Sequence, residues 1–340
     1  MLRPMSTNSQ HKDDQHTVNQ HSAPTHYNQD GDSDITEQAA LLVLLEHSND
    51  PAKICRQVEE CGSAFLLLSQ DGATGSISEQ QSLLPWADWN NHIDDMDKIK
   101  AEMSNWRELG IHFAAFFDNE YPPQLLTIRE SPPFITWYGT IERSDANGIA
   151  IVGTRHPGKL ALATAHSLAY QLSAKGITVI SGLAAGIDSA AHQGALEAGG
   201  RTVAITGTGL LHAYPPSNTE LQEEIAATGA VISQFLPDAP PSKDKFPTRN
   251  AIMSGYAGAT LVVEASWKSG ARLQARLATQ HGRPLFFTKQ MLNEDWVHQY
   301  LHLAGTHVIE DADDLIDTLG RYQIDDDTLE WGADQNAQNK

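Results

Sequence analysis

The chain has 340 residues, 40% of them hydrophobic, which is enough for one large globular domain or two of ordinary size. No apolar run approaches the roughly 18 residues that span a bilayer, and the polar first thirty residues contain no segment like a secretory signal. Cys55 and Cys61 are the only cysteines, too few for a disulfide framework or a thiolate-rich metal site. We therefore expect a cytoplasmic protein with no membrane partner, metal or cofactor.

The formal net charge of -20 is distributed unevenly along the chain. Residues 1–145 carry -14 and residues 306–340 carry -8, whereas residues 146–305 carry +2. The acidic charge therefore lies in the flanks, and the middle of the chain retains enough cations for a salt-sensitive contact with nucleic acid.

Residues 1–35 are rich in Gln, Asn, His and Ser and predict a disordered tail. His11, His16, His21 and His26 recur every five residues, a spacing that builds no fixed ligand set on a helix or a strand. Residues 36–109 predict a small all-α domain, with helices between Ile35 and Ser69 and again over about residues 92–109.

Residues 110–147 form a Pro-rich lead-in. Two proline pairs, at 122–123 and 132–133, flank a short helical turn, and the segment FITWYG that follows has strand character.

Residues 148–310 alternate short apolar strands with helices of ten to fifteen residues. The strands are IAIVG, ITVIS, TVAITG, AVISQF, TLVVEA and PLFF, and the helices lie at about 160–175, 188–199, 218–228, 248–257 and 270–281. This pattern predicts an α/β fold with a Rossmann-like, doubly wound parallel sheet that has helices on both faces. Residues 311–340 predict one short acidic helix and a solvated tail.

Ligands of such folds bind at the carboxyl ends of the strands, and four loops there have an unusual composition. They cover residues 153–157, residues 181–192, residues 206–209 leading into 214–218, and residues 243–250. Glycines in the second loop, with Ser181, allow close approach of the backbone to a phosphate. The fourth loop places Phe246 among the cations Lys245 and Arg249, a composition typical of single-strand binders.

Other chemistries lack their motifs. No complete G-x-G-x-x-G, no G-x-x-x-x-G-K-[ST] and no G-x-S-x-G is present. Asp188 is placed to cap a helix or to act in the site. His192 follows on the same helix face, and without a nucleophile it favours a packing or capping role.

In combination and order, five stretches resemble the DNA-processing protein A family (DprA, also called Smf). They are IAIVGTRHP, ITVISGLAAGIDSAAHQGALEAGGRTVAITGTGL, YPPSN, FPTRNAIMSG and TLVVEASWKSGARLQARLATQHGRP. The resemblance covers about residues 110–310 densely and implies a homodimer that binds single-stranded DNA without sequence preference. It also implies loading of a RecA-type recombinase in natural transformation, and no catalytic turnover.

Matched positions and loop chemistry together give the expected DNA-binding residues: Gly153, Thr154, Arg155, Ser181, Gly182, Gly186, Lys245, Phe246, Arg249, Asn250, Lys268, Ser269 and Gly270. Arg155, Arg249 and Lys268 are expected to contact phosphates, and Asn250 to form hydrogen bonds. Phe246 is expected to stack on a base, because Pro247 should hold its ring out of the following helix. The alternative for Phe246 is a plug over the domain core.

The sequence departs from the family at several positions. Ala251 and Ala185 stand where many members have Arg or a bulky residue, while Arg272 and Arg276 stand where the family is apolar or small, which indicates relocated cations. No segment resembles the C-terminal winged helix that many members carry.

Two alternative functions remain. The lonely-guy nucleoside-monophosphate phosphoribohydrolases share the Rossmann-like superfamily, but their P-G-G-x-G-T-x-x-E loop contains a catalytic Glu that residues 268–275 lack. A nucleotide-sensing module that uses the same glycine loops is the other alternative.

Overall fold

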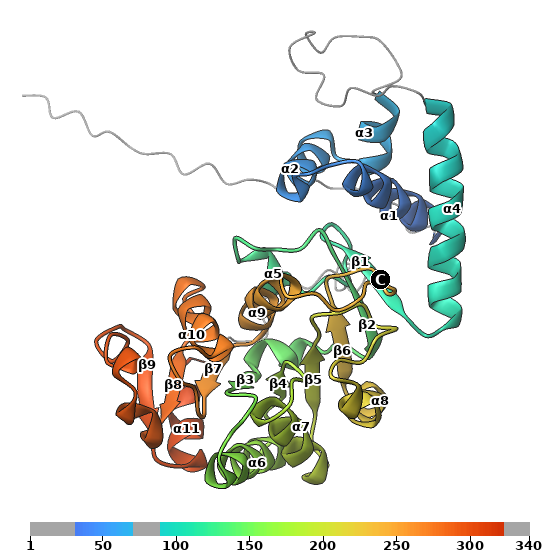
Figure 1. The fold of residues 1–340 in the computed structure, drawn as a ribbon. Coiled ribbons are helices and arrows are strands. Elements are labelled where there is room, and N and C mark those ends of the chain that lie inside the picture. The colour runs from blue at the N-terminus through green and yellow to red at the C-terminus, as the bar shows by residue number, and fades with distance from the viewer. Residues whose placement is uncertain (1–30, 71–88, 323–340) are drawn as a thin grey trace, which may run out of the picture.

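The computed structural model describes residues 31–70 and 89–322 (Figure 1). Residues 1–30 of the expected tail, with its four regularly spaced histidines, and residues 323–340 lie outside the described residues. Residues 31–35 belong to a helix that begins at Gly31, so the expectation of disorder is wrong for them. The helices are α1 (Gly31–Glu46), α2 (Pro51–Cys61), α3 (Ala64–Gln70), α4 (Trp89–Glu108), α5 (Pro123–Leu126), α6 (Lys159–Ala174), α7 (Ile187–Glu197), α8 (Thr219–Thr228), α9 (Lys245–Tyr256), α10 (Gly270–Gln280) and α11 (Ala312–Leu319). The strands are β1 (His112–Ala115), β2 (Phe134–Gly139), β3 (Ile149–Val152), β4 (Val179–Ser181), β5 (Thr202–Ile205), β6 (Ala230–Ser233), β7 (Ala259–Val262), β8 (Leu285–Thr288) and β9 (Thr306–Ile309).

The helices α2, α3 and α4 pack around the apolar segment of α1, whose residues 39–44 are buried. Glu37 fixes the start of α3, because its carboxylate accepts hydrogen bonds from Ser63 Oγ (2.6 Å) and from the backbone N–H of Ala64 (2.7 Å). Gln38 Nε2 donates to Asp118 just beyond β1 (2.7 Å), which ties α1 to the sheet. Within residues 31–70 and 89–109, the expected all-α character is confirmed.

The strands of the described residues form one sheet in the order β1-β2-β6-β5-β4-β3-β7-β8-β9. In the part of the sheet that runs β6-β5-β4-β3-β7-β8-β9, every neighbouring pair of strands is parallel, as expected for a doubly wound fold. The Pro-rich lead-in adds β1 and β2 as an antiparallel extension on β6, which the sequence analysis anticipated only as one isolated strand.

Both faces of the central strands are apolar, because successive side chains point to opposite sides of a strand. On β3, Ile149 and Ile151 pack with α6 and α7, whereas Ala150 and Val152 pack on the side of α9 and α10. Figure 1 shows α6, α7, α8 and α11 below the sheet and α9 and α10 above it. This arrangement confirms the predicted Rossmann-like class and brings the loops after β3 and β7 together.

Candidate nucleic-acid interface

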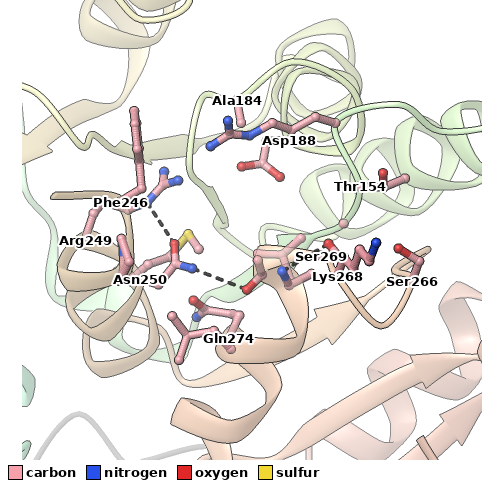
Figure 2. Close-up of a pocket in the computed structure, with 18 of the residues that line it drawn as sticks. Thr154, Ala184, Asp188, Phe246, Arg249, Asn250, Ser266, Lys268, Ser269 and Gln274 are labelled. Atoms are coloured by element: carbon pink, nitrogen blue, oxygen red, sulfur yellow. Dashed lines mark hydrogen bonds between the residues drawn. The ribbon is translucent and has the colours of Figure 1, made fainter. Parts of the chain in front are cut away.

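A pocket of about 630 Å³ lies where the loops after β3 and β7 diverge. β3 has β4 on one side and β7 on the other, so the chain leaves these strands toward opposite faces and opens a crevice between them. Figure 2 shows side chains entering this crevice from α9 on one side and from the loop before α10 on the other. Nine of the thirteen predicted site residues line it: Gly153, Thr154, Arg155, Phe246, Arg249, Asn250, Lys268, Ser269 and Gly270.

The loop of residues 153–157 is held between two other elements. Thr154 donates its N–H to Glu264 O (2.7 Å) and accepts from Ile187 N (3.3 Å). A Cβ on Gly153 would lie 2.7 Å from Ile187 Cβ and 2.9 Å from Glu264 O, so the position needs glycine. Gly186 has φ +89°, and a Cβ there would lie 2.5 Å from Thr154 O. The glycines therefore permit the close packing that positions Arg155.

The pocket lining is strongly cationic. It contains Arg155, Lys243, Arg249 and Lys268, and Asp188 is the one carboxylate among the residues that line it. Burial raises the pKa of Asp188, and the charges of Arg249 and Arg155 and backbone hydrogen bonds oppose that rise. The excess of positive charge suits an anionic ligand such as a phosphodiester.

Three helices begin at the pocket, since residues of the first turns of α7, α9 and α10 line it. The N–H groups of a first turn lack partners within the helix and carry partial positive charge. Ser269 caps α10 by accepting from Ala271 N (3.2 Å), and Asn250 reaches toward Gly270 O at 3.5 Å (Figure 2). The pocket therefore combines side-chain cations with helix N-termini, a combination that binds phosphate groups.

Arg249 lies in the wall of the pocket, with only 5% of its surface exposed. Its Nη1 donates to Gly182 O and to Ile205 O (2.8 Å), and its Nε donates to Asn250 Oδ1 (3.0 Å). Burial lowers the pKa of this guanidinium, while the charge of Asp188 raises it. Arg249 thus joins the ends of β4 and β5, a structural role that the sequence analysis did not anticipate.

Phe246 is not on a loop, and that prediction is wrong. α9 begins at Lys245, so Phe246 is the second residue of the helix and Pro247 the third. A proline is tolerated there because first-turn N–H groups have no intrahelical acceptor. The Phe246 ring is half-buried, 5.3 Å from the Tyr214 ring and 5.2 Å from Arg155 Cζ. The ring still faces the pocket, but from a fixed helix.

Four predicted residues do not line the pocket. Lys245 donates to Pro240 O (2.7 Å) and lies over the Phe235 ring. Ser181 is fully buried and donates to Ile151 O (2.6 Å). Gly182 supplies the backbone oxygen that accepts from Arg249, and Gly186 gives the backbone its close approach to Thr154.

Sequence reasoning left several lining residues out of the predicted site, among them Tyr214, Lys243 and Asp188. Each of them lies in one of the strand-end loops described above. Their position in those loops, and not their residue type, could have identified them as pocket residues. His192 is buried, bonded to Thr202 Oγ1 (2.7 Å), and burial lowers its pKa to about 3, which confirms a packing role.

The described residues contain no group of three His, Cys, Asp or Glu side chains placed to hold a metal ion. Among the same residues, no helix is both long enough and apolar enough to cross a bilayer.

Comparisons with known proteins agree with this fold. The family model of DNA recombination-mediator protein A matches residues 112–320. Protein Smf of Synechocystis is 36% identical over 224 residues, which is 64% of this chain and 55% of that protein, so the chain spans about half of that relative's length. DNA processing protein DprA of Bacillus subtilis is 31% identical over 67% of this chain and 77% of its own.

Two solved structures share the fold. DNA processing protein A of Streptococcus pneumoniae superposes with a TM-score of 0.68 at 24% identity, over 86% of this chain and 99% of that chain. The second is DNA processing protein A of Helicobacter pylori, whose structure was described as giving insight into the single-stranded DNA binding mode of that protein. It superposes with a TM-score of 0.55 at 28% identity, over 62% of this chain and 98% of that chain. Since the family model covers more than half of the residues and includes the entire pocket, the chain belongs to the DNA recombination-mediator protein A family.

Proposed function

We propose that this protein binds single-stranded DNA in the pocket at the carboxyl ends of β3 and β7 and acts in DNA processing without catalytic turnover. The observation that carries the proposal is the cationic lining of that pocket, in which four Lys or Arg side chains stand against one carboxylate. Family membership and the DNA-binding relative of Helicobacter pylori support it.

Arg155 and Lys268 bind phosphates in this proposal. Both side chains are exposed, and neither forms an ion pair with a carboxylate in the described part of the chain. Their donors are therefore available to a ligand. Phe246 and Tyr214 supply aromatic surface beside these cations, and stacking on such surface favours unpaired bases over duplex.

The test is a titration of single-stranded and duplex oligonucleotides across a salt series. Single strands should bind more tightly, and affinity should fall steeply with salt because phosphate neutralisation releases counterions. Lys268→Ala should lower the salt slope by roughly 0.7, because the variant neutralises one phosphate fewer than the parent. Equal affinity for duplex, or affinity independent of salt, would contradict the proposal.

The absence of turnover is part of the proposal and has its own test. Residues 268–275 lack the Glu that the phosphoribohydrolase loop requires. Asp188, the carboxylate that does line the pocket, is buried beside Arg249. Release of free base from AMP at enzymatic rates, abolished by Arg155→Ala, would favour the hydrolase alternative.

We further propose a cytoplasmic homodimer that delivers DNA to a RecA-type recombinase, as the family resemblance implies. The mass of the protein in solution tests the dimer. Recombinase filament formation on single-stranded DNA, with and without this protein, tests the partnership.

A further inference from the structure

We infer that Trp267 and Arg272 form a second nucleotide-binding position outside the pocket, where the indole stacks on a base of a strand that leaves the pocket. This inference rests on the proposed function, because it extends the path of the same bound strand. Three observations support it: the exposure of the Trp267 indole, the contact of Arg272 with that ring, and the position of Trp267 between two residues that line the pocket.

Trp267 lies on the loop between β7 and α10 and is 58% exposed. Its neighbours in sequence, Ser266 and Lys268, both line the pocket, but Trp267 and Arg272 do not. Adjacent Cα atoms are about 3.8 Å apart, so the indole stands at the rim of the pocket on the outer side of the same loop. A strand that passes Lys268 reaches Trp267 next.

Arg272 holds the indole in place. Its Cζ lies 3.4 Å from the centre of the Trp267 ring, a distance typical of a guanidinium stacked on an aromatic face. Arg272 belongs to the first turn of α10, so the helix fixes the position of the stack. An indole with one face covered and 58% of its surface exposed presents the other face to solvent, which is the geometry that a stacked base requires.

The surface beyond the indole continues the cationic character of the pocket. Arg276 follows Arg272 by four residues on α10, so both side chains lie on one face of the helix. Both arginines lie close enough to the buried Tyr300 to affect its ionisation: burial raises the pKa of Tyr300, and the positive charges of Arg272 and Arg276 oppose that rise. Neither arginine forms an ion pair with a carboxylate among residues 31–70 and 89–322, so both remain available to phosphates.

The experiment compares a short and a long oligothymidylate, of about 4 and about 16 nucleotides, which bracket the usual site sizes of single-strand binders. Fluorescence anisotropy gives the affinity of the parent and of Trp267→Ala, Trp267→Phe and Arg272→Ala. Trp267→Ala should weaken binding of the long strand by roughly 5- to 150-fold, the range for the loss of one stacked base. It should leave binding of the short strand unchanged, because that strand fits in the pocket alone. Trp267→Phe should retain most of the affinity.

Tyr170→Ala is the matched control, because Tyr170 is an aromatic side chain on α6, 43% exposed and outside the pocket lining. It should bind both strands as the parent does. A second readout is the quenching of intrinsic tryptophan fluorescence by the long strand, which Trp267→Phe should diminish.

The outcomes separate the two proposals. A parent that binds neither strand refutes the role of the pocket and this inference together. A parent that binds in a Lys268-dependent manner, with Trp267→Ala equal to it at both lengths, refutes the inference alone. A change in the solution mass on Trp267→Ala, without a loss specific to the long strand, would identify the indole as a protein interface and also overturn the inference.

Discussion

Replacing Arg249 by alanine should destabilise the protein far more than it changes the salt dependence of DNA binding. Arg249 is buried, and its Nη1 donates to the carbonyl oxygens of Gly182 and Ile205, at the ends of β4 and β5. Its Nε donates to Asn250. The substitution removes these donors and leaves two backbone acceptors inside the protein without a partner.

The magnitude follows from those two carbonyl bonds. A hydrogen bond to a charged group contributes about 1.5–3 kcal/mol, and a buried acceptor left without a partner costs a similar amount. The loss of both bonds should therefore lower the free energy of unfolding by about 3–6 kcal/mol. With an unfolding entropy of about 2.1 cal/mol/K per residue, roughly 270 folded residues give about 1.7 °C per kcal/mol, so the melting temperature should fall by about 5–10 °C.

The assay is thermal melting of Arg249→Ala and Lys268→Ala, combined with the salt dependence of single-stranded DNA binding for both. Lys268 is exposed, so its variant should melt like the parent and show the reduced salt slope. The structural role would be refuted by an Arg249→Ala protein that melts like the parent and whose salt slope for single-stranded DNA is lower by roughly 0.7, the contribution of one phosphate contact. In that case the guanidinium would bind a phosphate directly, as the sequence analysis expected.

Three further changes test other parts of the structure. A Cβ on Gly182 would overlap the Arg249 guanidinium, so Gly182→Ala should lower the unfolding free energy by about 1–3 kcal/mol in urea titration, whereas Gly270, with open space around it, should accept alanine. Phe246→Ala should weaken single-stranded DNA binding by about 1–3 kcal/mol while the salt slope stays unchanged, because stacking involves no counterion release. Burial raises the pKa of Asp118 from 3.8 to about 6, so the folded state binds a proton more tightly than the unfolded chain and its stability falls by about 2 kcal/mol as the pH rises from about 4 to about 7. Asp118→Asn should remove this pH-dependent loss, since both hydrogen bonds to the side chain, from Gln38 and Ala115, go to one oxygen that an amide retains.

Each of these has a clear contrary result. Equal urea midpoints for Gly182→Ala and Gly270→Ala would show that the Arg249 guanidinium moves aside for the added methyl group at little cost in stability. A Phe246→Ala protein that melts several degrees early would support the core-plug alternative. A difference in stability between Asp118→Asn and the parent that is constant from about pH 4 to 7 would show that folding does not raise the pKa of this carboxyl.

The amino-acid pattern alone predicts the architecture of the core. The apolar runs of residues 149–152 and 259–262, set between helical segments, favour central strands of a covered parallel sheet, and the structure buries every residue of both runs. The glycines and cations at the ends of these strands then had to meet at one edge of the sheet. The position of the pocket therefore followed from local pattern and topology.

The orientation of individual side chains depends on contacts that form only in the folded protein. Arg249, Lys245 and Arg155 are all cations near the same strand ends, yet Arg249 turns inward, Lys245 turns to Pro240 and Phe235, and Arg155 stays exposed. The acceptors that bind Arg249 lie 67 and 44 residues earlier in the chain, so no local pattern encodes them. Similarly, the packing of Phe246 against Tyr214 favours a helix start at Lys245 over the extended backbone that Pro247 alone would favour. A cation or an aromatic ring in a loop marks the site, but the partners that the fold brings to it determine whether the side chain binds ligand or supports the protein.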